Sequence, residues 1–286
     1  MPPVLSLHPC IVGWLAWPEL ADLAAGTGYR GAVIAREQPF PPRAKGSVRA
    51  TSMQLPAEIR RDESAFLNSL PRLASACRFA AEIGCRLAYV GLPPSSEQPR
   101  DLQAALYRER LKRCCEILDE HSIRLALECI TPLHMRRAHA YEFIGRTDEM
   151  LEFGLTVSPA CGLVMDSWHW HHAGSDPNWI RQIPADRVLD VHLADSPVAP
   201  PEEIRDSERL LPGEGVVDFR TFFELLTEKR YPGAYTLEIF SSLLNSLDPA
   251  RAAALAFQAA SRTLKKCGLA VLPSEETATP PDSAEA

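Results

Sequence analysis

Eight short apolar, β-rich runs alternate with helical patterns along the 286-residue chain. The predicted strands cover residues 3–9, 29–35, 48–56, 85–94, 123–130, 161–167, 187–196 and 234–240. The predicted helices cover residues 19–28, 64–84, 99–121, 148–155, 218–231 and about 248–267, with Pro71 as a break or restart in the second. Eight strand–helix units over this length favour closure into a single (β/α)8 TIM barrel with parallel strands, and an open doubly wound sheet is the alternative.

The barrel is predicted to occupy residues 1–271 as one domain. The remaining segment, residues 272–286, is polar, acidic and proline-containing. A segment of this composition buries too little apolar surface to offset its loss of conformational entropy on ordering. We therefore expect a disordered C-terminal tail.

The net charge and the cysteines indicate which binding partners and which cellular compartment to expect. The net charge is −7 and the pI is about 5.7, which argues against a general affinity for nucleic acid. The eight cysteines have no paired CxxC spacing, and several lie in apolar stretches, as expected for small buried side chains in a reducing compartment. The apolar N-terminus lacks the basic region of a signal peptide, and no run approaches a membrane span. We expect a cytoplasmic protein without a membrane partner.

Each of the last four predicted strands carries a metal-capable residue near its C-terminal end: Glu128, Asp166, His192 and Glu238. The carboxyl ends of barrel strands surround the active-site mouth, so these side chains are expected to converge. Three carboxylates and one imidazole in one cavity demand a compensating cation, and this donor set suits Mn²⁺, Mg²⁺, Co²⁺ or Zn²⁺. A strand-end carboxylate can instead cap the next helix, but the apolar flanks of Glu128 and Glu238 weaken that alternative.

The same residues form an ordered set of motifs: a strand-end Glu, then D-x-x-H, H-x-x-D, "LPGEG" and a final strand-end Glu. This set resembles the xylose isomerase-like TIM-barrel superfamily of sugar phosphate isomerases and epimerases, over about residues 4–267. The resemblance implies that Glu128, Asp166, His192 and Glu238 bind one divalent ion. It also implies that Glu128 and Glu238 transfer protons across the ion, and that His169 contacts the substrate.

Other candidates remain open between two interpretations. The resemblance suggests that a basic residue after the seventh strand grips substrate oxygens, for which Arg209 is the best placed. Glu214 either supports Arg209 or belongs to a turn. His8 either faces the cavity as a substrate contact or is a buried, hydrogen-bonded histidine.

The stretch "WHWHH" holds further candidates. His171 and His172 are expected to orient a loop or face solvent, while Trp168 and Trp170 either wall the cavity or pack in the core. After the fifth strand, Arg136 and Arg137 either bind an anionic group or form a solvated loop.

These features predict a metal-dependent isomerase or epimerase of a small sugar, keto-sugar or keto-polyol, acting by proton transfer through an enediolate. A lyase resembling inosose or dehydroshikimate dehydratases of the superfamily is the alternative. A DNA-repair endonuclease on the same barrel is a less favoured alternative, because it would need more metal-binding histidines and a basic face. A barrel that binds sugars without catalysis is the last alternative, since fold does not fix function. Whether the chain forms a homo-oligomer is left open.

Overall fold

The computed structural model describes residues 3–37, 39–40 and 48–269. Eight parallel strands close into a barrel, as predicted, in the order β1-β10-β9-β8-β6-β4-β3-β2. The strands are β1 Val4–Leu7, β2 Gly31–Ile34, β3 Arg49–Gln54, β4 Leu87–Leu92, β6 Arg124–Cys129, β8 Gly162–Asp166, β9 Val188–Leu193 and β10 Ala234–Leu237. The predicted tail, residues 272–286, lies outside the described residues.

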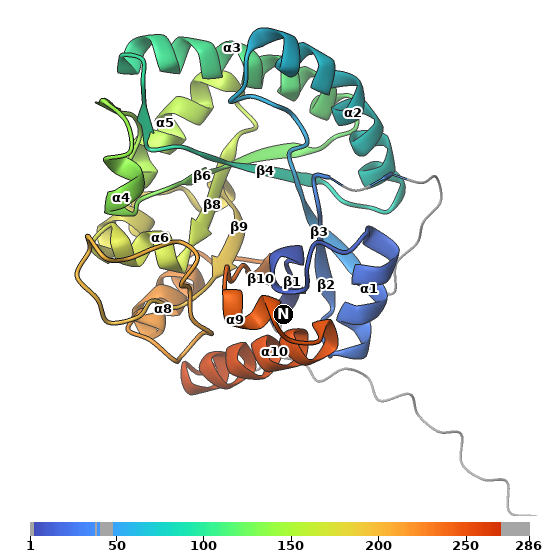
Figure 1. The fold of residues 1–286 in the computed structure, drawn as a ribbon, viewed down its shortest axis with the longest axis vertical. Helices are drawn as coiled ribbons and strands as arrows, with labels where there is room; N and C mark the ends of the chain where they lie inside the picture. The colour runs from blue at the N-terminus through green and yellow to red at the C-terminus, as the bar shows by residue number, and fades with distance from the viewer. Residues whose placement is uncertain (1–2, 38, 41–47, 270–286) are drawn as a thin grey trace, which may run out of the picture.

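Among the described residues, six helices of ten or more residues surround the barrel strands (Figure 1). They are α1 Trp17–Gly26, α2 Glu63–Glu82, α3 Arg100–Asp119, α5 Thr147–Val157, α8 Phe219–Glu228 and α10 Pro249–Lys266. Aspartates cap several of them: Asp62 accepts from a backbone N–H of α2, and Asp248 accepts from two of α10, whose first residue is Pro249. The sequence therefore sets where these helices begin.

The prediction of a break at Pro71 is wrong, because α2 continues through this proline. Proline removes one N–H donor and leaves the carbonyl of Leu67 without its usual partner. Both residues lie on the exposed side of the helix, where water can solvate that carbonyl. The apolar face, which includes Phe66 and Leu73, stays packed against the barrel.

Short elements that the sequence did not indicate lie in the connections between the barrel strands and the longer helices. β5 Ser95–Ser96 and β7 Tyr141–Glu142 form a separate antiparallel pair, so the last four barrel strands carry the labels β6, β8, β9 and β10. The short helices are α4 Leu133–Arg136, α6 Ser167–His172, α7 Pro177–Arg181 and α9 Ser242–Asn245, with 3₁₀ turns at Pro9–Ile11 and Ala185–Arg187.

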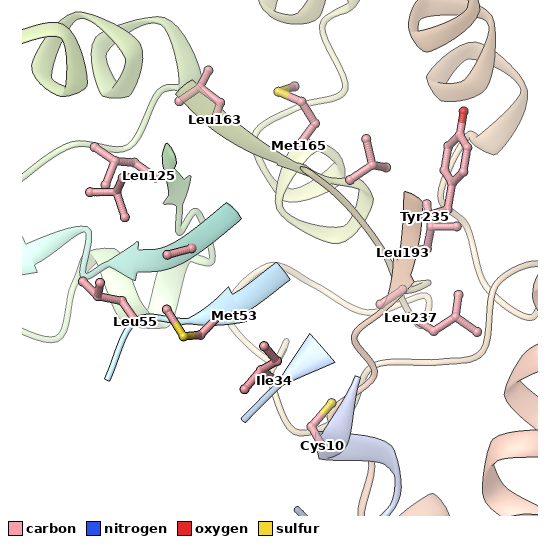
Figure 2. Close-up of a cluster of buried hydrophobic side chains, with 14 of the residues drawn as sticks. Cys10, Ile34, Met53, Leu55, Leu125, Leu163, Met165, Leu193, Tyr235 and Leu237 are labelled. Carbon is pink, nitrogen blue, oxygen red and sulfur yellow. The ribbon is translucent and has the colours of Figure 1, made fainter. Parts of the chain in front are cut away.

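The main core is built from apolar residues of the strands and of the helices around them, and Figure 2 shows a part of it that includes Met53, Leu125 and Leu237. A second, small cluster contains Tyr89 and Val164, from strands β4 and β8. Cysteines contribute to the core as predicted: all eight are free, and seven are buried. No helix among the described residues has the length and hydropathy needed to cross a bilayer.

Candidate metal centre

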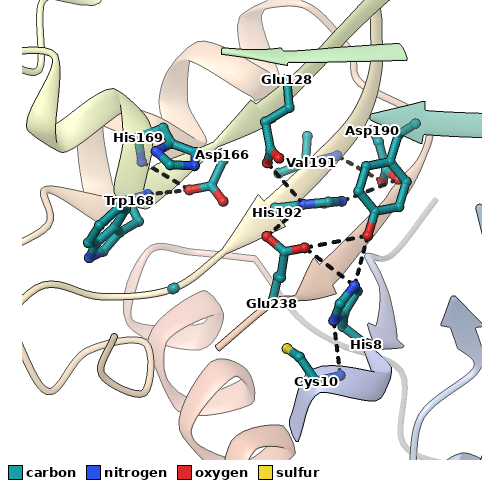
Figure 3. A network of polar contacts seen from close by, with 12 residues as sticks. His8, Cys10, Glu128, Asp166, Trp168, His169, Asp190, Val191, His192 and Glu238 are labelled. Atoms are coloured by element: carbon teal, nitrogen blue, oxygen red, sulfur yellow. Dashed lines mark hydrogen bonds and ion pairs between the residues drawn. The ribbon is translucent and has the colours of Figure 1, made fainter. Parts of the chain in front are cut away.

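Glu128, Asp166, His192 and Glu238 come together at the C-terminal ends of β6, β8, β9 and β10 (Figure 3). One potential ligand atom from each residue lies within 4.8 Å of the others, and all four residues are buried. Register explains part of this convergence, because Asp166 and His192 are directly paired between β8 and β9. The predicted cluster is therefore present in the fold.

The two carboxylate oxygens of Asp166 have different roles: one caps α6 and the other faces the cluster. Its Oδ1 accepts hydrogen bonds from the backbone N–H groups of Trp168 at 2.7 Å and His169 at 3.0 Å, which caps α6. Its Oδ2 faces the cluster and lies 3.1 Å from the guanidinium of Arg209. The helix-capping interpretation and the ligand interpretation thus apply to different atoms of one side chain.

Asp190 is a site residue that the sequence reasoning missed. It precedes His192 by two residues on β9, so both side chains face the same side of the sheet. Its Oδ2 lies 3.5 Å from His192 Nε2, while His192 Nδ1 lies 3.3 Å from Glu128 and 3.4 Å from Glu238. This arrangement directs Nδ1 into the cluster, as a carboxylate behind a metal-binding histidine does. The D-x-H spacing on a predicted strand was the available signal.

Several buried polar atoms of the cluster have no hydrogen-bond partner among the described residues. They include Glu128 Oε1 and His192 Nδ1, the ring nitrogen that faces the cluster. Buried polar groups without partners are costly, and a site that collects them is suited to an additional bound group. Three carboxylates and one imidazole are a donor set for a divalent cation. The residues present therefore fit such an ion.

The two glutamates have oppositely shifted pKa values. Burial, reinforced by the charge of Glu238, raises the pKa of Glu128 to about 7. Burial also acts to raise the pKa of Glu238, but His192, His8 and Arg209 outweigh it and hold this pKa well below its ordinary value. The pKa of His192 is raised because the surrounding carboxylates outweigh desolvation. One fold thus holds two carboxyl groups with different proton affinities.

Arg209 is buried, so it is no surface arginine. Its guanidinium donates to Asp166 Oδ2 at 3.1 Å, Glu238 Oε2 at 3.2 Å and Asp206 Oδ1 at 2.8 Å. The group lies between the rings of Trp168 and Phe240, at 4.7 and 4.9 Å from their centroids. Stacking and three carboxylates together place this cation beside the cluster.

His8 lies behind Glu238. It is fully buried, and its Nε2 is 2.7 Å from the hydroxyl of Tyr89 and 3.3 Å from Glu238 Oε1. Its Nδ1 accepts the backbone N–H of Cys10, and burial lowers its pKa to about 4. The sequence reasoning missed Tyr89. Its ring also packs edge-on against the ring of His192, with 4.8 Å between the ring centroids.

His169 sits at the first turn of α6, buried, with its Nε2 3.4 Å from Arg209. Its Nδ1 has no hydrogen-bond partner in the described part of the chain, and burial lowers its pKa to about 3. A neutral imidazole with an open nitrogen beside a cationic group is suited to contact a substrate oxygen.

The other aromatic residues of this stretch divide by environment. Trp168 packs against Arg209 and His169, whereas Trp170 packs against Phe222 in the core. His172 is half-buried, and its Nε2 lies 3.1 Å from Ser196 Oγ. The ring of His171 packs edge-on against the ring of His172. Both histidines line a separate cavity of about 430 Å³ that contains none of the four candidate ligands.

Asp195, the last residue of the H-x-x-D motif, anchors the loop that carries Arg209. Its carboxylate accepts four backbone hydrogen bonds of 2.8–2.9 Å, from Ser196, Gly213, Gly215 and Val217. Its backbone also pairs with Leu210, next to Arg209. Glu214 is exposed within this turn, and its backbone N–H donates to Leu211, so the turn interpretation holds.

A cavity of about 270 Å³ opens onto the cluster and is lined by Glu128, Glu238 and Arg209. Two further arginines that the sequence reasoning missed, Arg36 and Arg60, also line it. They follow β2 and β3 on loops whose positions no local pattern indicates. Arg136 lies outside this cavity and pairs with Glu142 at 3.1 Å, while Arg137 is exposed.

A larger cavity of about 570 Å³ lies at the opposite end of the barrel, where the strands begin. Its lining includes Arg49, Arg86 and Arg124, and it contains no candidate ligand. Active sites of this fold lie at the C-terminal ends of the strands. The smaller cavity is therefore the relevant one.

A profile of the family described as xylose isomerase-like TIM barrel matches residues 43–267. The chain belongs to this family. Two solved structures share its fold. A xylose isomerase domain protein from Alicyclobacillus acidocaldarius has a TM-score of 0.82 and 24% identity, and the match covers 93% of this chain and 99% of that one. The IolI protein with a bound zinc atom has a TM-score of 0.76 and 17% identity, and the match covers 93% of this chain and 99% of that one.

Three curated relatives, all named as enzymes, match parts of the chain. The 3-dehydroshikimate dehydratase of Pseudomonas putida is 35% identical over 85 residues, 29% of this chain and 13% of that protein. The inosose isomerase of Halalkalibacterium halodurans is 24% identical over 156 residues, covering 50% and 51%. The L-ribulose-5-phosphate 3-epimerase UlaE of Salmonella typhi is 24% identical over 205 residues, covering 69% and 67%. The match spans about half or less of the first two relatives.

Proposed function

We propose that this protein is a divalent-metal-dependent isomerase or epimerase of a small sugar, keto-sugar or keto-polyol. The observation that carries the proposal is the convergence of two buried glutamates, Glu128 and Glu238, with Asp166 and His192 in one cluster. Membership of the family and relatives named inosose isomerase and L-ribulose-5-phosphate 3-epimerase support it.

The four clustered residues would hold one Mn²⁺, Mg²⁺, Co²⁺ or Zn²⁺ ion. When bound, the ion would supply Lewis-acid chemistry, which would acidify the C–H bond beside the carbonyl of a hydroxy-ketone. Asp190 orients His192 for this role from behind.

Glu128 and Glu238 transfer the proton in this proposal. One carboxylate removes a proton from the carbon next to the carbonyl, and the electron pair of the broken C–H bond enters an enediolate. The other returns a proton to the opposite face for epimerisation, or to the neighbouring carbon for aldose–ketose isomerisation.

Three further residues assist. His169, with its open Nδ1, and Arg209 are proposed to contact substrate oxygens. His8 is fully buried, and both of its ring nitrogens have hydrogen-bond partners. We therefore propose that His8 positions Glu238, in place of the substrate contact predicted from the sequence.

The test is deuterium incorporation from D₂O, with Mn²⁺ present, across a panel of keto-sugars and cyclic polyols. Glu128→Gln and Glu238→Gln preserve size and one oxygen donor, so each should lower turnover about 100-fold or more while metal content is retained. The exposed Glu214→Gln variant is the matched control and should keep wild-type turnover. A metal-loaded Glu128→Gln protein with the wild-type rate would show that the two-carboxylate mechanism is wrong.

A dehydratase is the second candidate, favoured by the 35% identical stretch shared with 3-dehydroshikimate dehydratase. The same proton removal, followed by departure of a β-hydroxyl as water, would give an unsaturated ketone. Appearance of its ultraviolet absorbance, without an isomeric product, would select this reaction.

A further inference from the structure

The cavity above the metal centre is lined by three arginines, and their charges are balanced unequally. Arg209 is surrounded by Asp166, Asp206 and Glu238. Arg36 pairs with Glu58 at 2.5 Å. In the part of the chain that the structure describes, Arg60 has no carboxylate within 4.0 Å, and its one hydrogen bond goes to the carbonyl of Gly91. Arg60 is therefore the cation of this cavity without an acidic partner.

Arg60 is held close to the cluster. Gly91, whose carbonyl it contacts, lies on β4 and is directly paired with Glu128 on β6. A side chain at Gly91 would approach Glu128 Oε2 to 3.0 Å, which shows how closely the two residues pack. A group bound by Arg60 would thus lie within one small molecule's length of the two glutamates.

The backbone that carries Arg60 is preorganised by a buried arginine. Arg110 donates to the carbonyl of Ile59 at 3.0 Å and to that of Arg61 at 2.6 Å, the residues on either side. It also pairs with Glu63 at 3.0 Å. Arg60 itself is exposed, so a ligand that enters the cavity can reach it without displacing a carboxylate. The loop is fixed while the guanidinium stays accessible.

Arg36 adds a second open donor to the same wall. Its Nε is buried and makes no hydrogen bond within the described residues, and a carboxylate oxygen, Oε1 of the exposed Glu37, lies 3.7 Å away. A guanidinium presents N–H donors in a planar fork that matches the oxygens of a carboxylate or phosphate. Neutral hydroxyls satisfy such donors less well.

We propose that Arg60, assisted by Arg36, binds an oxyanion group, a carboxylate or a phosphate, on the substrate whose hydroxy-ketone lies at Glu128 and Glu238. The inference rests on the proposed function for the position of the hydroxy-ketone. It makes the substrate an acidic carbohydrate-like molecule, and it assigns specificity to the wall formed after β2 and β3.

The test compares pairs of ligands with and without the anionic group, on the full chain loaded with Mn²⁺. The phosphate pair is L-ribulose 5-phosphate and L-ribulose, and the carboxylate pair is 3-dehydroshikimate and its methyl ester. Dissociation constants come from titration calorimetry, and a ligand that turns over is compared by kcat/KM. Arg60→Gln is measured against Arg61→Gln, the adjacent exposed arginine that does not line the cavity.

We expect the wild-type protein to prefer the anion of at least one pair by about 10-fold or more, and the pair that shows the preference identifies the group. Arg60→Gln should abolish the preference and Arg61→Gln should retain it. Equal affinities within both pairs, an unchanged preference in Arg60→Gln, or no binding of either anion would overturn the inference.

The two proposals fail differently. Turnover of a neutral keto-sugar, unaffected by Arg60→Gln, would leave the proposed function standing and remove the anion subsite. Anion binding that depends on Arg60, without deuterium exchange on any substrate, would leave the anion subsite standing and remove the proposed function.

Discussion

Replacement of Asp195 by asparagine should destabilise the loop that carries Arg209. The carboxylate accepts four backbone hydrogen bonds: Oδ1 from Ser196 and Val217, and Oδ2 from Gly213 and Gly215. Asparagine has the same shape but offers one acceptor oxygen, so two N–H groups would face an NH₂ group instead.

The magnitude follows from the burial of those donors. A buried donor left without its partner costs about 1–3 kcal/mol, and water can partly replace a half-buried one. The Gly213 and Gly215 bonds are half-buried, so asparagine should turn its NH₂ group toward them. We expect a loss of about 2–4 kcal/mol in the free energy of unfolding. At about 2 °C per kcal/mol for a chain of this size, Tm should fall by about 4–8 °C.

Urea unfolding followed by tryptophan fluorescence, together with a thermal melt, measures this loss. Glu214→Gln removes a charge from the same loop at an exposed position, and its stability should stay within about 0.5 kcal/mol of wild type. If Asp195→Asn proved as stable as this control, the four hydrogen bonds would not hold the loop, and the reasoning would be refuted.

Four other variants test the remaining features. His192→Ala should weaken Mn²⁺ binding at least about 10-fold, and Asp190→Asn should weaken it by about 10–100-fold. Competition titration measures both affinities. Full metal occupancy in His192→Ala would exclude His192 as a ligand. Gly215→Ala would place a Cβ 2.1 Å from the carbonyl of Ser196, so the variant should melt below wild type; an unchanged melt would contradict this packing. Burial lowers the pKa of His172 from 6.5 to about 4, so the stability of the folded state is full above pH 6.5 and falls as the pH drops toward 4. Solvent screens this half-buried ring, so the loss should be well below the about 1.4 kcal/mol per pH unit of a fully buried group. The urea midpoint of His172→Asn should change less with pH over that range than the wild-type midpoint, and an equal slope would refute this assignment.

The sequence by itself determined the barrel and the cluster. Strand–helix alternation has a period that local patterns reveal, and eight parallel strands close with their carboxyl ends on one side. Glu128, Asp166, His192 and Glu238 could be predicted together for that reason. Local chemistry also placed Asp62 and Asp248 at the starts of their helices.

Pro71 shows a limit of local rules. A proline inside a helical pattern predicts a break, but the cost of its missing hydrogen bond depends on whether the freed carbonyl reaches water. That depends on which side of α2 faces the barrel, and this orientation is a property of the packed fold.

Tertiary structure alone decided the surroundings of the cluster. Arg36 and Arg60 come from loops after β2 and β3, and they meet Arg209, which the sequence had suggested, because barrel closure brings these loops to one mouth. Their partners are equally nonlocal: Arg209 stacks between Trp168 and Phe240, and Arg110 fixes the backbone beside Arg60 from α3. Loop conformations are set by such long-range hydrogen bonds and packing, which have no sequence period. The residues proposed to hold a metal could therefore be predicted from the strand ends, whereas the charge that Arg36 and Arg60 add to the cavity wall became visible only in the closed barrel.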